Sequence, residues 1–462
     1  MQKARKGILA VAGRMLLIGF SIQIVLGLVW LFCNFTGHHR FGETLVYEEI
    51  AETLICDEYE GILYPVLIRI TKGMEGLLPI PYRCFLYLLQ LGTAFFAADT
   101  LLGSVGVKRG LGRIWGSLVL LTFPMAMQCH IAVVPDSLVS SFLLLELALA
   151  IAAFRSGELL CFSRLAKVLG CFVAVALLLP DNLLIGAVPP LFLLLYGLVG
   201  AWRKDRKRIF SYVVLVCAFM GILGGVNSLT RVEGYYGRAH KSAQLAMAGR
   251  CAWLYIGYHY DDLPEEVKTC LTPGDALQVS CYADKVEQVL GRKLEEAYGE
   301  EHSRELLLAL AGQAWEADRD TILHNAAWDV VGYLFSPMVV QRQFGGMAYD
   351  SYSGRNYDIM REKTPVLTTY YMDYGCRWFT AALLISAAGW LVSAAARLLR
   401  RVQAVISVVM CLCTFGVLTL VYTLRGAGMM DYKKSVAITL MWVLGMLLLC
   451  HRGMTEEQES EG

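Results

Sequence analysis

Long apolar runs recur along this chain, and they constrain its fold more than any other feature of the sequence. The first run, residues 8–33, is apolar almost throughout and is interrupted by Arg14. A helix rises about 1.5 Å per residue, so this run exceeds the roughly 20 residues that cross a bilayer. With 56% hydrophobic residues, 18% charged residues and a mean hydropathy of +0.51, the chain is too apolar for an ordinary soluble domain. We therefore expect an all-α polytopic membrane protein.

Further apolar runs bring the expected number of transmembrane helices to about ten. They lie at residues 84–102, 114–128, 138–154, 168–179, 183–201, 209–225, 379–396, 402–424 and 436–450. The sequence Pro180-Asp181-Asn182 is a strong turn signal, which divides 168–201 into two helices. Basic residues gather at the N-terminus and in alternate connections, so both termini are expected in the cytoplasm and the first run is expected to be a retained anchor.

This topology predicts the domain organisation. We expect a transmembrane module at residues 1–227 with about seven helices and a first outer loop at 34–82, an external and mostly helical domain at 228–376, C-terminal transmembrane helices at 377–450, and a cytosolic tail at 451–462. Helical periodicity within the external domain covers residues 284–310 and 313–335.

The first outer loop contains the most acidic part of the chain, residues 42–65. Its apolar residues recur at helical spacing, with glutamates on the other face, which predicts an amphipathic helix along the membrane surface. The apolar positions are Tyr47, Ile50, Ala51 and Leu54, and the glutamates of the wet face are Glu48, Glu49 and Glu52. Glu43 precedes this helix and can project toward a cavity at the membrane.

The same loop resembles that of the membrane glycosyltransferases of the GT-C fold, which include protein O-mannosyltransferases and the aminoarabinose transferases of lipid A (glycosyltransferase family 39-like). Their pattern is similar to Asp-Glu-x-x-Tyr-x-x-x-Ala, and Glu43, Tyr47 and Ala51 fit its spacing. Tyr64-Pro65 resembles the Tyr-Pro with which such loops return to the membrane. The chain departs from the pattern because Glu43 replaces Asp and Thr44 replaces Glu. The other register begins at Asp57-Glu58, but no Tyr follows four residues after Asp57.

The resemblance implies a GT-C-like core with an external insertion, and a sugar transfer from a polyprenyl-phosphate-linked donor to a glycan, lipid or protein acceptor outside the cytoplasm. A carboxylate would deprotonate the acceptor hydroxyl. Glu43 is the expected base, with Asp57 and Glu58 in reserve. The other expected partners are membrane lipids of the cell envelope, and with a net charge of +1 we expect no nucleic acid.

Other site candidates lie elsewhere in the sequence. Asp136 begins a predicted helix, where an aspartate is either an N-cap or a second catalytic carboxylate, as the resemblance implies. Tyr47 and Tyr64 are candidates for substrate contact. Basic residues expected outside the cytoplasm could bind the donor phosphate. They are Arg231, Arg238, Lys241 and Arg425.

Cofactors and disulfides are not fixed by the sequence. Asp261-Asp262 is too small a set of oxygens to indicate a divalent-cation site, so the sequence establishes no cofactor and leaves a divalent cation open. Cys270 and Cys281 form either an external disulfide or two free thiols.

Two other classes of function remain open. A transporter or lipid-carrier flippase would place ionisable groups near the bilayer midplane and often shows repeated halves. An envelope assembly protein without catalytic activity would use residues 228–376 as a binding module.

Overall fold

A computed structural model describes residues 2–37, 44–54, 61–104, 106–156, 162–179, 183–204, 209–229, 243–280, 286–334 and short stretches between 366 and 378. These residues are mostly helical and include no strand, which confirms the all-α class within the described part of the chain. The crossings expected at 379–396, 402–424 and 436–450 lie outside the described residues.

The chain divides into two compact units, and the first contains the helices α1 to α10. Their bounds are α1 Gln2–Asn34, α2 Thr44–Thr53, α3 Leu63–Glu75, α4 Tyr82–Ser104, α5 Leu111–Leu121, α6 Pro124–His130, α7 Asp136–Ser156, α8 Phe162–Leu178, α9 Leu183–Lys204 and α10 Ile209–Leu229. The division of 168–201 into two helices is confirmed, since α8 ends at Leu178 and α9 begins at Leu183.

Among the described residues of this unit, three stretches of helix are long and apolar enough to cross a membrane: Arg14–Asn34, Tyr82–Ser104 and Asp136–Ala153. Shorter apolar helices lie at Leu111–Leu121, Ile185–Val199 and Ile209–Gly225. The protein therefore has the helices of a membrane protein.

The single helix expected over residues 114–128 is a wrong prediction. The chain leaves α5 at Thr122, and Phe123 takes an extended conformation before α6 begins at Pro124. A proline ring clashes with a helical residue before it, which explains the extended backbone of Phe123. The hydropathy of the run conceals this break because every residue around it is apolar or small.

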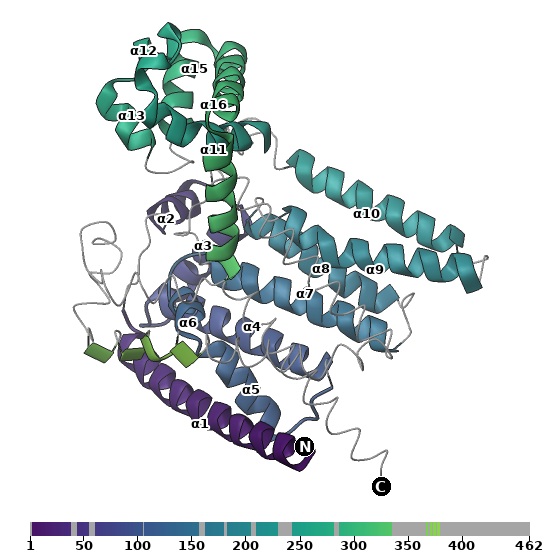
Figure 1. Cartoon of the computed structure of the whole chain (residues 1–462). Coiled ribbons are helices and arrows are strands. Elements are labelled where there is room, and N and C mark those ends of the chain that lie inside the picture. The colour runs from purple at the N-terminus through teal and green to yellow at the C-terminus, as the bar shows by residue number, and fades with distance from the viewer. Residues whose placement is uncertain are drawn as a thin grey trace. The chain divides into compact units, whose positions relative to one another are not determined.

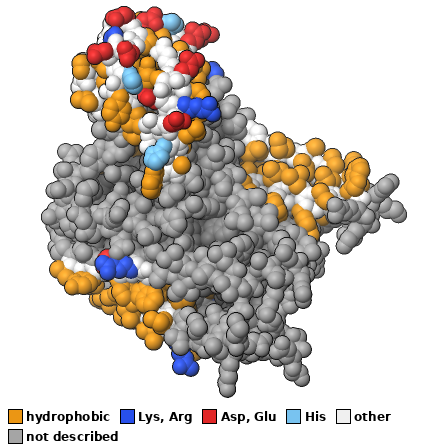
Figure 2. Space-filling view, viewed as in Figure 1, with side chains coloured by type: hydrophobic (Ala, Val, Ile, Leu, Met, Phe, Trp, Pro, Cys, Tyr) orange, Lys and Arg blue, Asp and Glu red, His pale blue; other side chains and the backbone are white. Residues whose placement is uncertain are grey.

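Helices α4, α7, α8 and α9 pack side by side in the first unit (Figure 1). Close packing uses small residues, among them Ala94, Ala97 and Ala98 on α4, which are buried. Large apolar side chains are exposed along α1 and α10, and Figure 2 shows them gathered on these two helices. Phe32 and Phe210 are examples at 88% and 77% exposure. A bilayer would cover such side chains.

Residues from the 370s pack against the N-terminal helix of the same unit. The Tyr371 hydroxyl donates to the Thr122 carbonyl, and the Tyr371 ring lies 5.7 Å from that of Trp30 on α1. The Tyr374 hydroxyl donates to the Gly19 carbonyl over 3.3 Å. The first unit thus joins residues that lie as many as 355 positions apart in the sequence.

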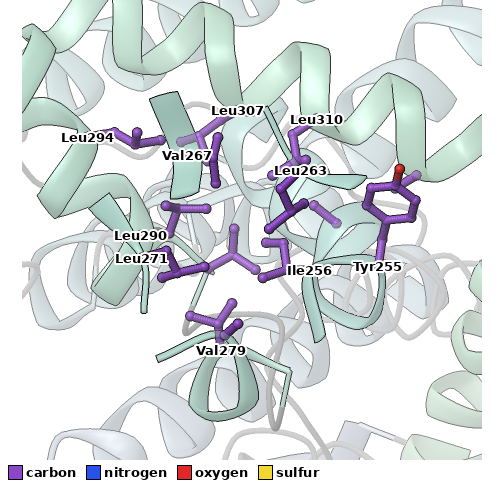
Figure 3. Packing of buried hydrophobic residues seen from close by; sticks show 14 of the residues in the cluster. Tyr255, Ile256, Leu263, Val267, Leu271, Val279, Leu290, Leu294, Leu307 and Leu310 are labelled. Carbon is purple, nitrogen blue, oxygen red and sulfur yellow. The ribbon is translucent and has the colours of Figure 1, made fainter. Parts of the chain in front are cut away.

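The second unit contains α11 Ala243–Tyr258, the short helix η3 Tyr260–Asp262, α12 Glu265–Cys270, α13 Pro273–Val279, the π-helical turn η4 Val286–Gly291, α15 Arg292–Tyr298 and α16 Glu300–Leu334. Aliphatic side chains from these helices meet in one core, which Figure 3 shows at close range. Ile256, Val267, Leu290 and Leu310 are buried in it. The domain boundaries expected near residues 227 and 376 stay predictions, because residues around each are outside the described part.

Helical structure over 284–310 is confirmed from Val286 onward, but it is not one continuous helix, because the chain breaks at Gly299 between α15 and α16. Gly299 has a φ of +82°, which glycine adopts readily and other residues rarely do. From Glu300 onward the helix continues to Leu334, across the expected gap between 310 and 313, with one non-helical residue at Asp318.

Candidate functional site

The connection between α1 and α4 folds back onto the first unit through α2 and α3. The amphipathic helix expected around Tyr47 is confirmed as α2. Its apolar face is covered by protein, since Tyr47, Ile50 and Ala51 are buried. The position of this helix along a membrane surface stays a prediction. Periodicity predicted the buried face of α2 but could not predict that protein covers it.

Tyr47 and Tyr64 bring α2 and α3 together. Their rings meet edge to face, with centroids 5.3 Å apart. Both side chains are buried, and Tyr64 is completely inaccessible to solvent. Gly61, just before α3, has no room for a side chain, because a Cβ there would lie 2.2 Å from the Leu177 carbonyl oxygen of α8. The connection is therefore held tightly against the helices below it.

Gln90 of α4 links this connection to the α6–α7 turn, which comprises residues 131–135. The Tyr64 hydroxyl donates to Gln90 Oε1 over 3.0 Å. The Gln90 amide donates to the carbonyl oxygens of Cys129, His130 and Ala132, at 3.0, 3.0 and 3.1 Å. When both the oxygen and the nitrogen of a buried amide have hydrogen-bond partners, the amide fixes the segments that carry those partners in position. Gln90 thereby sets the place of α3 relative to the turn.

Thr44 makes the second link between the connection and the turn. Its hydroxyl donates to the Val133 carbonyl over 3.0 Å, and its side chain is fully buried. Thr44 is the first residue of α2 and follows Glu43 in the sequence. The start of α2 is therefore bonded directly to the turn that precedes Asp136.

The start of α7 adds three polar side chains to this region. Asp136 is its first residue and is buried. His130 Nδ1 lies 2.7 Å from the Ser137 Oγ. Burial lowers the pKa of His130 to about 3, so the imidazole is neutral at pH 7. A neutral imidazole beside a hydroxyl is a hydrogen-bonding pair and not a charged contact.

Together these residues form what we call the buried polar cluster: Thr44, Tyr47, Tyr64, Gln90, His130, Asp136 and Ser137. Burial raises the pKa of Tyr64 well above its usual value, with further contributions from neighbouring tyrosines and from Asp136. The Tyr64 phenol is therefore neutral and remains a hydrogen-bond donor. The effect of Asp136 on Tyr64 shows that the carboxylate lies within electrostatic range of the phenol.

The solvent side of α2 carries a separate set of ion pairs and hydrogen bonds. Glu52 pairs with Lys72 of α3 over 2.9 Å, which lowers the pKa of Glu52. The Tyr82 hydroxyl donates to Glu48. Glu49 points to solvent on the same helix. The glutamates expected on a wet face thus lie there, with Glu48 partly covered.

The structure brings three of the predicted site residues together, namely Tyr47, Tyr64 and Asp136. The other candidates lie outside the described residues: Glu43, Asp57, Glu58, Arg231, Arg238, Lys241 and Arg425. Sequence reasoning missed Gln90 and Thr44. Gln90 offered a signal, because it is an uncharged polar residue with apolar residues on both sides over positions 84–91.

In the second unit, one group of polar side chains is centred on His259. The carboxylates of Asp262 and Asp318 flank His259, at 3.5 and 3.1 Å from its two ring nitrogens. Cys270 is a free thiol, and Cys281 lies outside the described residues. Among the residues that the structure describes, no three His, Cys, Asp or Glu side chains are grouped to hold a metal ion.

Comparison of the chain with protein-family models, with curated proteins and with solved structures finds no match.

Proposed function

We propose that this protein is an integral membrane glycosyltransferase, which moves a sugar from a polyprenyl-phosphate donor to an acceptor outside the cytoplasm. Glu43 acts as the general base in this proposal, and the loop that carries it is external. The sequence resemblance to the GT-C enzymes is the origin of the idea.

The observation that supports it is the direct bonding of two loops that both carry candidate carboxylates. Thr44, next to Glu43 in sequence, bonds to Val133, three residues before Asp136. Gln90 bonds to both loops at once. Such bonding favours a site in which two carboxylates act on one substrate, since catalysis needs groups held in a fixed geometry.

The described cluster has a positioning role in this mechanism. Buried hydrogen bonds of Thr44, Tyr64 and Gln90 hold the two loops in a fixed position relative to each other. Glu43 would take the proton of the acceptor hydroxyl as its oxygen attacks the anomeric carbon, and the lipid phosphate would leave with the bonding electrons. Arg231, Arg238, Lys241 and Arg425 are the candidates to stabilise the negative phosphate.

The test replaces the proposed base with its neutral isostere, Glu43→Gln. Full-length protein in proteoliposomes is given radiolabelled polyprenyl-phosphate mannose or aminoarabinose with membrane extract as the acceptor source. Loss of a general base lowers a rate by about 100-fold or more. We expect a decrease of that size in labelled acceptor with unchanged protein yield.

The matched control is Glu49→Gln, which removes the same charge from the exposed face of α2. This variant should transfer sugar at the wild-type rate. Equal activity of Glu43→Gln and wild type would refute the role of Glu43. Absence of transfer by wild type with either donor, together with movement of intact lipid-linked sugar between leaflets, would favour a flippase instead.

One described residue favours the flippase or transporter class. Glu146 lies in the apolar run of α7 and is fully buried. Ionisable groups inside a membrane are typical of proton and ion pathways. This glutamate is therefore the kind of group that the sequence analysis expects of a transporter.

A further inference from the structure

Glu146 is the acidic side chain placed deepest in a candidate membrane span of the described chain. It lies ten residues after Asp136, where the span Asp136–Ala153 begins. At about 1.5 Å per residue this is about 15 Å along α7, half the roughly 30 Å of a bilayer core. Glu146 is therefore close to the midplane if α7 crosses the membrane.

Protein surrounds the Glu146 side chain completely. Its exposure is 0%, and neither carboxyl oxygen has a hydrogen-bond partner among the residues that the structure describes. α7 packs against α4, α8 and α9. The buried residues next to it along α7 are aliphatic, including Leu143, Leu147 and Ala150.

No described cation is available to neutralise this carboxyl. The titratable group close enough to interact with it electrostatically is the thiol of Cys171 on α8, which is itself buried. Asp99, the acidic residue in the apolar part of α4, differs from Glu146 because it forms an ion pair with Arg113 of α5. A bound metal ion would need several convergent oxygens, and the described residues group none there.

An ionised carboxylate without water or a partner is highly unfavourable in such surroundings, and the group neutralises instead. We propose that Glu146 is an intramembrane proton-binding site, which takes one proton from solvent and holds it at neutral pH. An O–H bond forms on one carboxyl oxygen and no electron is transferred. The site is independent of the proposed sugar transfer, and it provides the kind of group that proton relays use.

Infrared difference spectroscopy on full-length protein in lipid nanodiscs tests the proposal without any activity assay. At neutral pH, subtraction of the Glu146→Gln spectrum from wild type should leave the C=O band of a protonated carboxyl, which shifts in D2O. The matched control is Glu52→Gln, whose carboxylate pairs with Lys72 at the protein surface. That subtraction should leave carboxylate bands instead.

Carboxylate bands from Glu146 at neutral pH would overturn the proposal. So would a melting temperature that rises with added Na⁺ or K⁺ in wild type but not in Glu146→Gln, because a metal cation would then occupy the site. If the Gln variant did not fold, Glu146→Leu and Glu146→Asp would decide. Folding of the Leu variant supports a neutral group, whereas carboxylate bands in a folded Asp variant at neutral pH would show that the site holds a charge.

Discussion

At the scale of single residues, Gln90 and Glu146 are two polar side chains in apolar helices with opposite surroundings. Every polar atom of the Gln90 amide group has a partner, and the partners belong to α3, α6 and the α6–α7 turn. Neither oxygen of Glu146 has a partner in the described part of the chain. The first arrangement fixes the geometry of neighbouring segments, and the second leaves a group that can bind a ligand as small as a proton.

Replacement of Gln90 should destabilise the first unit strongly. Gln90→Leu removes the partner of Tyr64 and of three carbonyl groups, and buried polar groups without partners cost about 1–3 kcal/mol each. We expect the free energy of unfolding to fall by about 2–4 kcal/mol in total, because water can form hydrogen bonds with some of these groups. Denaturant titration of the purified protein in detergent measures this.

Gln23→Leu is the matched control for Gln90→Leu. Gln23 is a buried glutamine of α1 with one hydrogen bond, to the Val119 carbonyl over 3.1 Å. Its loss should lower the free energy of unfolding by about 1 kcal/mol. If the two variants were equally stable, the central place of Gln90 in the polar cluster would be wrong.

At the scale of elements, α13 carries a complete N-terminal capping box. Thr272 and Asp275 exchange side-chain and backbone hydrogen bonds, and Lys293 pairs with Asp275 over 2.7 Å. The bond from Lys293, followed by those from Thr272, lowers the pKa of Asp275 to about 2. Stability from this carboxylate is present above its ordinary pKa of about 3.9 and is lost as the pH falls toward 2.

Asp275→Asn should therefore destabilise α13 in a pH-dependent way. At pH 6 we expect a melting temperature a few degrees below wild type, and the difference should shrink as the pH approaches 2. Asp320→Asn, at an exposed aspartate of α16, is the control and should show no such convergence. A difference between Asp275→Asn and wild type that stays constant down to pH 2 would contradict the assignment.

The helices also show which elements the sequence could predict. Apolar length predicted the helices that carry the three candidate spans, and periodicity predicted α2, because burial on one face leaves a local pattern. The breaks at Phe123 and Gly299 depend on single residues inside otherwise regular patterns. The contacts of Gln90 with residues 129–132 depend on tertiary packing of segments about 40 residues apart, which no local pattern records.

At the scale of the whole molecule, the first unit depends on close contacts between distant parts of the chain. Gly375 packs against the ring of Pro124, where an added Cβ would lie 2.2 Å from Pro124 Cγ. Gly27 of α1 packs in the same way against Thr122 and Tyr371. Small residues at these positions allow the helices to approach closely, as is usual in membrane proteins.

Gly375→Ala should disturb this packing, because the proline ring cannot rotate away. Overpacking costs about 1–3 kcal/mol, so we expect a lower melting temperature for the full-length protein in detergent. Gly73→Ala is the control, since a Cβ there meets nothing within 4 Å and alanine favours the helix. Equal stability of Gly375→Ala and wild type would show that this contact is loose.

The bond from Tyr374 to Gly19 has a consequence for biogenesis. The two residues are 355 positions apart in the chain. A ribosome adds about 5–20 residues per second, so α1 leaves the ribosome roughly 20 to 70 s before Tyr374 has been made. During this interval the part of α1 around Gly19 lacks its final neighbour. Lipid or an insertion factor must cover this part of α1 until Tyr374 has been made.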